Sequence, residues 1–299
     1  MKKLLTIVTS IGLALALTGC KKKKLKIDLK DKGPCIGNGY ENHNWYDEYN
    51  RFIPVKKYET IYDEKNNKVY DLEYMWFNRK EWSQLDHMTE YVYDDNGLLI
   101  KSLKSLDYSY NTLSKAYRYE EYEYNGDKLI TKKEYSKANG LESTETYTYD
   151  SFGNVSSVTY NGTSKWKREY TYNSNNQKTS VLYYEYNTKT NGYNDAIIEN
   201  SYEYDEKGNL IVYAHTNTGG YNNVYDAYSY KEVYTYDSNN KKREKLGYIL
   251  KNGEYIERAK FIYDYYENGN CKDLTCYIKK DGEWANNYKL VYFTTIYND

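Results

Sequence analysis

Apolar and polar positions alternate with a period of two along much of this chain, as in a β-strand with one half-buried face. One copy of the pattern shows the arrangement in full. Tyr202 and Tyr204 share one face of a predicted strand, and Asp205 to Asn209 supply the residue types of a tight turn. Leu210 to Val212 then predict the return strand of a hairpin.

This hairpin pattern recurs along the chain. The motif is Tyr-x-Tyr followed by Asp or Asn, with looser copies, and its second aromatic lies at Tyr62, Tyr93, Tyr124, Tyr149, Tyr172, Tyr204, Tyr236, Tyr263 and Tyr297. Successive copies are 23 to 34 residues apart, which indicates a repeat architecture. A second class of turn, Asn-Gly or Asp-Gly, separates the copies, as at Asn252 and Asp281. Two turns for each copy predict about eighteen antiparallel strands.

We therefore predict an all-β fold, an antiparallel meander of repeated β-hairpins that forms a curved or spiralling sheet. Sheets of more than about ten strands curl, split or flatten, so a flat open sheet is disfavoured. We expect the tyrosine rows on the inner face. A β-propeller with two repeats in each four-stranded blade is the alternative, although an odd number of copies leaves half a blade.

The start of the chain has a different pattern. Two lysines precede an apolar run from Leu4 to Leu17, the layout of a secretory signal. The run is shorter than the roughly 20 residues of a spanning helix. Its end, Leu17-Thr18-Gly19-Cys20, resembles the lipobox of bacterial lipoproteins. The resemblance implies cleavage before Cys20, so residues 1–19 would be removed, and acylation of the thiol and of the new amino terminus.

A lipid on Cys20 would anchor the protein to a membrane of the cell envelope. Lys21 rather than Asp follows the cysteine, and in the Gram-negative lipoproteins that this segment resembles such a residue permits passage to the outer membrane. The resemblance therefore implies the outer membrane or the cell surface. The alternative is an ordinary signal peptide with a chance cysteine. The lysines that follow either lie on anionic headgroups, at about 1 kcal/mol each, or form a flexible tether. We expect the lipidated cysteine, tether and an irregular segment over residues 20–57, and the repeat domain over 58–299.

Composition and charge refine this picture. Tyrosine accounts for 43 of 299 residues, and the mean hydropathy is −1.00. Low hydropathy alone indicates disorder, but tyrosine favours strands and carries a large ring, so tyrosine rows can replace an aliphatic core. Without the seven lysines up to Lys26, 35 basic side chains stand against 43 acidic ones. This mildly acidic body disfavours a nucleic-acid partner, which needs a basic face.

The fuller form of the motif, Tyr-x-Tyr-Asp-x-x-Gly-Asn, occurs at Tyr147 to Asn154 and at Tyr202 to Asn209. It resembles the YD repeats of the Rhs family and the tyrosine-rich repeats of bacterial surface proteins. In large Rhs proteins such repeats build a spiralling β-sheet shell around a toxin. This chain is too short to enclose cargo, and its repeats run to the last residues. The resemblance implies a β-sheet architecture and an envelope setting, and no activity.

Residues with catalytic or metal-ligand spacing are not evident. The three histidines lie far apart and have no neighbouring cysteine or second histidine: His43, His87 and His215. We predict no metal site, no cofactor and no histidine base. The recurring Asp residues follow the repeat period, so we interpret them as turn formers, not as calcium ligands or a glycosidase pair. Besides Cys20 an odd number of cysteines remains, which predicts a free thiol or external pairing. They are Cys35, Cys271 and Cys276.

Aromatic residues beside the second class of turn are the candidate binding residues. They are Tyr193, Tyr221, Tyr255 and Trp284. Along one edge of a repeat sheet, such rings could contact sugar rings or a protein surface. Alternatively, each ring covers its own hairpin through cross-strand packing.

These observations predict a non-enzymatic, membrane-anchored envelope lipoprotein, a repeat scaffold that contacts protein or other envelope components. The prediction depends on the lipobox and on repeats that fill the body of the chain. The alternative is a carbohydrate-binding module or adhesin that uses the turn-proximal aromatics. A glycan-cleaving enzyme with a carboxylate pair in the sheet is the least favoured interpretation.

Overall fold

The computed structural model describes residues 35–77, 81–106, 117–217, 229–267 and 269–297. Most of this part of the chain is β-strand, with one short 3-10 helix, η1 (Asp47–Tyr49). The first nine strands are β1 (Cys35–Tyr46), β2 (Arg51–Tyr62), β3 (Lys68–Phe77), β4 (Glu81–Tyr93), β5 (Leu99–Leu106), β6 (Arg118–Asn125), β7 (Lys128–Ser136), β8 (Gly140–Tyr149) and β9 (Val155–Asn161). The others are β10 (Lys165–Tyr172), β11 (Lys178–Asn187), β12 (Gly192–Tyr193), β13 (Ile198–Tyr204), β14 (Leu210–Asn217), β15 (Tyr230–Tyr236), β16 (Lys242–Lys251), β17 (Glu254–Tyr265), β18 (Cys271–Lys280) and β19 (Glu283–Tyr297).

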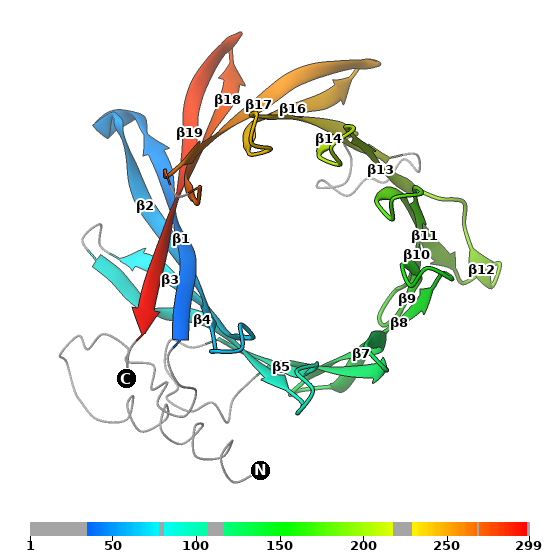
Figure 1. Cartoon of the computed structure of the whole chain (residues 1–299). Helices are drawn as coiled ribbons and strands as arrows, with labels where there is room; N and C mark the ends of the chain where they lie inside the picture. Colours follow the sequence, from blue (N-terminus) through cyan, green and yellow to red (C-terminus); the bar gives the residue numbers. More distant parts are fainter. Residues whose placement is uncertain (1–34, 78–80, 107–116, 218–228, 268, 298–299) are drawn as a thin grey trace. The chain divides into compact units, whose positions relative to one another are not determined.

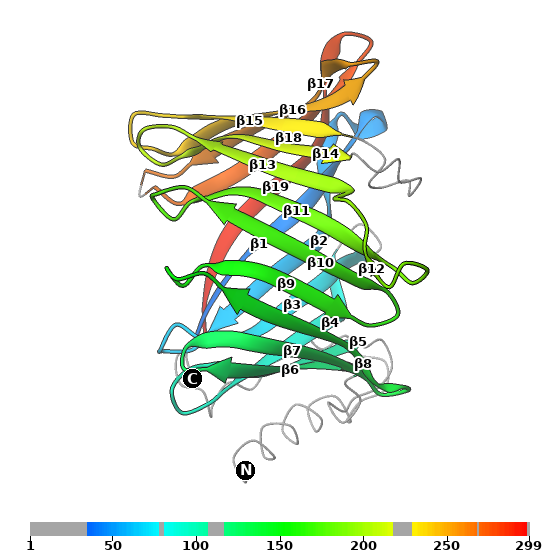
Figure 2. The same ribbon diagram turned by 90° about the vertical axis from the view of Figure 1, so that its right-hand side faces the viewer.

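The chain divides into two compact units. Unit 1 comprises Met1–Tyr122, Lys133–Glu142 and Tyr288–Asp299, and unit 2 comprises Glu123–Lys132 and Ser143–Asn287. In unit 2 the strands from β9 to β18 pair antiparallel with their neighbours in chain order, except that β11 pairs with both β12 and β13 (Figure 2). These strands form antiparallel hairpins, as the residue pattern predicts. Within the described residues, the structure contains no helix long and apolar enough to cross a membrane.

The first and last strands of the chain are neighbours in unit 1. β1 pairs antiparallel with β2 on one side and with β19 on the other (Figure 1). Tyr40 lies opposite both Tyr58 and Tyr292, with ring centroids 4.9 and 5.7 Å away. The hydrogen bonding therefore closes the sheet as an antiparallel β-barrel. The prediction of an open curved or spiralling sheet is wrong, and so is the propeller alternative. Closure pairs the backbone groups that an open edge would leave unsatisfied.

The strand that closes the sheet comes from a segment expected to be irregular. Residues 35–57 instead form β1, η1 and the first half of β2. Gly37, Asn38, Gly39 and Asn42 in β1 are residue types that strands disfavour. Hydrogen bonds to two partner strands, one of them more than 240 residues away, outweigh this local preference.

The turn of the repeat has the same geometry in several copies. After Tyr204, the Asp205 carboxylate accepts hydrogen bonds from the backbone N–H groups of Lys207 (3.0 Å) and Asn209 (2.8 Å). The backbone N–H of Gly208 donates to the Asp205 carbonyl, and Gly208 has a φ of 84°, which glycine adopts without strain. The register shifts by one residue at Tyr204, a β-bulge. The same backbone-accepting side chain recurs at Asp63, Asp94, Asp150, Asn173 and Asp237.

In six copies, the tyrosine that ends the strand bonds its hairpin to the preceding one. The Tyr204 hydroxyl donates to the backbone carbonyl of Lys178 (2.9 Å), and the Tyr236 hydroxyl donates to that of Leu210 (2.8 Å). The equivalent bond is made by Tyr93, Tyr149, Tyr172 and Tyr265. Each such bond contributes about 1 kcal/mol to stability. This role explains why a tyrosine, and not a phenylalanine, ends the strand in these copies.

One copy of the motif is displaced from the position that the sequence pattern indicated. The residue pattern predicts the motif at Tyr263 and Asp264, but the register shift lies at Tyr265. Tyr265 donates to the preceding hairpin, through the Lys242 carbonyl at 2.7 Å. Tyr266 takes the place of the turn-forming Asp, and its backbone N–H bonds to the Asn270 carbonyl.

Unit 1 contains a cluster of fully buried side chains. Ile61 and Tyr70 have no exposed surface, and Leu72 is 2% exposed. Ile61 lies opposite Tyr70, and Leu72 lies two residues further along β3 on the same face. Most repeat tyrosines of unit 2 are half-buried. Tyrosine rows therefore stand in for an aliphatic core in the repeats, while β2–β4 retain a small core of the ordinary kind.

Candidate functional site

Two of the four predicted binding aromatics lie in one surface group on β15–β19 of unit 2. We call this group the aromatic–lysine array. Its members are Lys231, Tyr248, Tyr255, Lys260, Tyr277, Lys279 and Trp284.

Strand register places the array on a single face of the sheet. Lys231 lies directly opposite Tyr248, and Lys260 lies directly opposite Tyr277. Side chains directly opposite each other in an antiparallel pair point to the same face. This is the face of the residues between the two motif tyrosines, such as Thr235, not the face of the tyrosines themselves.

Each aromatic ring of the array lies against a lysine ammonium group. Lys231 Nζ is 4.7 Å from the Tyr255 ring centroid and 5.3 Å from that of Tyr248. Lys260 Nζ is 4.9 Å from the Trp284 centroid and 5.3 Å from that of Tyr277. Such cation–π contacts contribute about 0.5–1 kcal/mol each at exposed sites. They hold rings and charges in alternation along the surface.

Acidic groups border the array. The Lys279 ammonium lies 5.3 Å from the Trp284 centroid and donates to the Glu257 carboxylate at 2.7 Å. Partial burial, with the nearby carboxylates of Glu257 and Glu244, raises the pKa of Tyr248. The Tyr248 hydroxyl is protonated at neutral pH, as that of an ordinary tyrosine is, and can donate a hydrogen bond.

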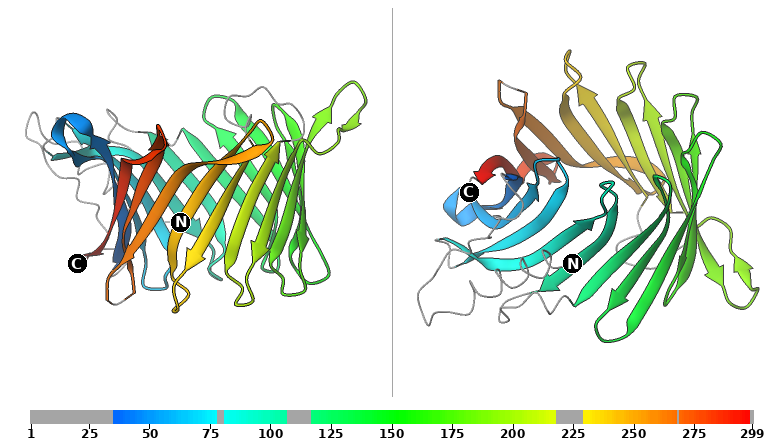
Figure 3. Two further views of the ribbon diagram at one scale, coloured as in Figure 1. Left: turned by 90° about the horizontal axis from the view of Figure 1, so that it is seen from above. Right: turned by 60° about the horizontal axis from the view of Figure 1, so that its bottom comes forward.

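Tyr193 belongs to a second group on β10–β12. It packs edge-on against Tyr186 across the hairpin, with centroids 5.4 Å apart, and Lys167 Nζ lies 5.1 Å from its ring. The hairpin that ends in β12 projects beyond the neighbouring strands of unit 2 (Figure 3, yellow-green). Tyr193 is 39% exposed, as is Tyr255. Tyr193 therefore packs across its own hairpin, which is the alternative to a binding role for these aromatics.

The structure thus brings Tyr255 and Trp284 into one array and leaves Tyr193 in another group. Tyr221 and Cys20 lie outside the described residues. Tyr248 and Tyr277 were not identified from the sequence, because they lie within strands and not beside a turn. Both lie in return strands, and only the strand register shows that they share the face of the residue between the two motif tyrosines.

Cys271 and Cys276 both lie in β18, and Cys271 carries a free thiol. Cys276 is buried, with 2% of its surface exposed, whereas Cys271 is half-buried. The predicted free thiol is thus present in this strand.

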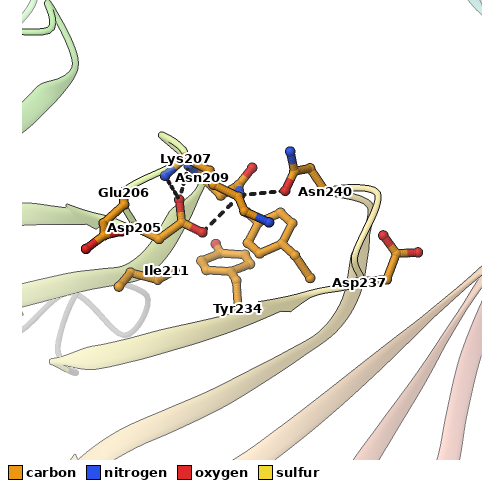
Figure 4. A pocket seen from close by; sticks show the side chains of 9 residues that line it. Asp205, Glu206, Lys207, Asn209, Ile211, Tyr234, Asp237 and Asn240 are labelled. Carbon is orange, nitrogen blue, oxygen red and sulfur yellow. Dashed lines mark hydrogen bonds between the residues drawn. The ribbon is translucent and has the colours of Figure 1, made fainter.

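A shallow pocket of 410 Å³ lies between the turns that follow Tyr204 and Tyr236 (Figure 4). Its lining includes the carboxylates of Asp205, Glu206 and Asp237. Both oxygens of Asp205 are engaged within its own turn, Oδ1 by backbone N–H groups and Oδ2 by the Asn209 side chain at 2.9 Å. The Asp residues of this pocket are therefore turn formers, as predicted.

The hydrogen bonds of these turns lower the pKa of two aspartates. Asn209 holds the pKa of Asp205 below its usual value, and the Lys241 backbone N–H does the same for Asp237. Glycoside hydrolysis needs a carboxyl whose pKa is raised so that it can protonate the leaving group. These two carboxyls have the opposite shift, which suits them to turn formation.

This shift predicts a loss of stability in acid. Because the folded pKa lies below the unfolded value of about 3.9, the contribution is complete above that value and is lost as pH falls through the folded pKa. We expect the double substitution Asp205→Asn and Asp237→Asn to flatten the acid limb of the unfolding free energy, measured by urea denaturation from about pH 6 to 3. Asn173 already forms the same turn bonds, at 3.0 Å each, so the fold should be retained.

The matched control is Asp195→Asn, at an exposed position outside these turns. It should leave the acid limb as steep as in the wild type. Equal slopes in the wild type and the double variant would contradict the role assigned to the two aspartates.

No protein-family model and no curated protein matches the sequence. A porin-like protein from Bacteroides uniformis is 8% identical, with a TM-score of 0.44 over 86% of this chain and 97% of that one. The structure of TcdB2-TccC3-TEV is 12% identical, with a TM-score of 0.40 over 84% of this chain, which spans 15% of that chain's length.

Proposed function

We propose that this protein is a non-enzymatic, lipid-anchored component of the bacterial cell envelope that holds its repeat sheet outside the bilayer and binds a partner through the aromatic–lysine array. The array is the observation that carries the proposal. Trp and Tyr supply much of the binding energy at protein interfaces, and the lysines add attraction for carboxylates or phosphates.

The surface of the repeats supports a position outside lipid. A strand that faces lipid carries apolar side chains at every second position over a band of about 25 Å. In unit 2 the residues between the two motif tyrosines are polar and exposed: Glu123, Thr148, Thr171, Glu203 and Thr235. The opposite face carries charged side chains such as Arg168 and Lys245 among its tyrosines. Both faces are therefore suited to water.

Site-specific photocrosslinking tests for a protein partner. A photoactivatable phenylalanine analogue in place of Tyr255 should crosslink to a protein in intact cells. The control position is Phe152, which is 80% exposed but lies in the turn between β8 and β9, away from the array strands. Crosslinks from position 255 and none from position 152 are expected. Equal crosslinking from both positions would count against the array as a specific surface.

A carbohydrate partner is the second candidate, favoured by the placement of Tyr255 and Trp284 on one face. Aromatic rings can stack on sugar rings, and the lysines would suit an acidic glycan. The test is a glycan array probed with the full chain in detergent. Trp284→Ala should reduce binding at least tenfold, because the variant loses the one tryptophan among the four aromatic side chains of the array.

Trp166→Ala is the control for the glycan experiment. Trp166 stacks on Tyr160 at 5.0 Å on the opposite face of the unit 2 sheet, so its loss should leave glycan binding unchanged. Binding that survives Trp284→Ala would remove the array from the glycan hypothesis. Absence of both protein crosslinks and glycan binding would contradict the proposed function.

A further inference from the structure

Three potential metal ligands converge on two adjacent strands of unit 1. Glu73 comes from β3, and Asp86 and His87 come from β4. His87 Nδ1 lies 3.1 Å from Asp86 Oδ2 and 4.0 Å from Glu73 Oε2. One ligand atom from each residue lies within 4.8 Å of the other two. The group is distinct from the aromatic–lysine array, which belongs to unit 2.

A β-bulge creates this arrangement. Glu73 pairs with His87, whereas Tyr74 pairs with Leu85, so Asp86 is the extra residue on β4. In a regular strand, Asp86 and His87 would point to opposite faces. A bulge re-aims a side chain, and bulges are frequent next to functional sites. Here the bulge lets two consecutive side chains meet Glu73.

Two of the three side chains are largely buried, and burial makes the charge of a carboxylate unfavourable unless it is paired. The side chains of Asp86 and Glu73 are 12% and 19% exposed, and their carboxylates lie close together. His87 Nδ1 is buried and makes no hydrogen bond of good geometry, although it faces both carboxylates. The Lys56 ammonium group binds Oε1 of Glu73, and Oε2 of the same carboxylate faces His87. Among the described residues, the ion pairs of this group join one lysine to two carboxylates, which leaves negative charge on two largely buried side chains, while the His87 side chain is 45% exposed.

We propose that Glu73 Oε2, Asp86 Oδ2 and His87 Nδ1 bind a divalent transition metal ion of the Zn²⁺ class. Zinc bonds of about 2.0–2.2 Å place neighbouring ligand atoms roughly 3 to 4 Å apart, in agreement with the two separations to His87. An imidazole ligand favours Zn²⁺ and similar metals over Mg²⁺ and Ca²⁺, which prefer all-oxygen sets. Three protein ligands leave a coordination position for water or for a group of a partner.

The sequence alone did not indicate this group. Glu73 and His87 are 14 residues apart, and zinc spacing rules search for Cys and His pairs. A hairpin places the two residues opposite each other, and a bulge that has no signal in the residue pattern adds Asp86.

Isothermal titration with ZnCl₂ tests the site. The full chain, purified in detergent without a polyhistidine tag and treated with a chelator, should bind one Zn²⁺ with saturation. Glu73→Gln, Asp86→Asn and His87→Gln should each weaken binding at least tenfold. The control is His43→Gln, because His43 pairs with a single carboxylate, Glu41, at 3.1 Å and should not affect zinc binding.

A second measurement does not depend on variants that could misfold. The chain has three histidines, so their imidazole NMR signals can be assigned. Addition of Zn²⁺ should shift the His87 signals and leave those of His43 and His215 in place. The proposal is overturned if Zn²⁺ does not bind with saturation, if the His87 signals do not move, or if folded His87→Gln protein binds Zn²⁺ as tightly as the wild type.

Discussion

Replacement of Cys20 by alanine is expected to move the protein from the membrane fraction to the soluble fraction. The segment Leu17 to Cys20 resembles a lipobox, and the thiol of Cys20 would carry the lipid. Each buried methylene contributes about 0.8 kcal/mol to membrane binding, and stable anchoring requires more than one acyl chain. Removal of the thiol therefore removes nearly all of the membrane affinity. The apolar run from Leu4 to Leu17 is short for a spanning helix, which needs roughly 20 residues.

Cell fractionation and labelled palmitate measure this effect. Wild-type protein should take up the label and sediment with membranes, whereas the Cys20→Ala protein should do neither. Cys271→Ala is the matched control, because Cys271 is a half-buried thiol in β18, and it should keep both label and membrane association. If the Cys20→Ala protein stayed with membranes, the anchor would have to lie elsewhere, and the proposal that the sheet stands outside lipid would fail with it.

Replacement of Ile61 by alanine is expected to lower the free energy of unfolding by about 2–5 kcal/mol. Ile61 has no exposed surface and lies opposite Tyr70, which is also fully buried. The substitution removes buried apolar surface and leaves a cavity beside a rigid ring, so little of the loss can be recovered by relaxation. The loss is several times the roughly 1 kcal/mol expected when one motif tyrosine loses its hydroxyl. Urea denaturation followed by tyrosine fluorescence measures it.

Ile100→Ala provides the matched control in the same unit. Ile100 is 39% exposed on β5, so the same chemical change removes side-chain surface that is partly in water already. We expect a loss below about 1 kcal/mol for this variant. Similar losses for Ile61→Ala and Ile100→Ala would show that the buried cluster of β2–β4 is not the most stabilising part of unit 1.

The repeat hairpin could be predicted from the sequence because its determinants are local. Asp205 and Gly208 are close in sequence, and their hydrogen bonds form within a single turn. The alternation of Tyr202 and Tyr204 defines the strand face in the same way. Where a copy departs from the motif, as at Tyr265, the residue pattern placed the turn two residues too early, and only the register of β17 with β18 located it.

The candidate sites were predicted less completely because their members come together across strands. Tyr255 and Trp284 were found through neighbouring turns, but the lysines that cover their rings come from β15, β17 and β18. The aromatics inside strands could not be assigned to a face without the register.

By itself, the sequence determined the antiparallel hairpins, their turns, the tyrosine face and the resemblance of the start of the chain to a lipoprotein signal, because each depends on residues a few positions apart. Only the tertiary structure decided that β1 pairs with β19, that Asp86 lies in a bulge beside Glu73 and His87, and that the array shares one face. These features depend on pairing between distant strands. A one-residue change in register reverses the face of every side chain, and no local pattern in the chain records which register is adopted.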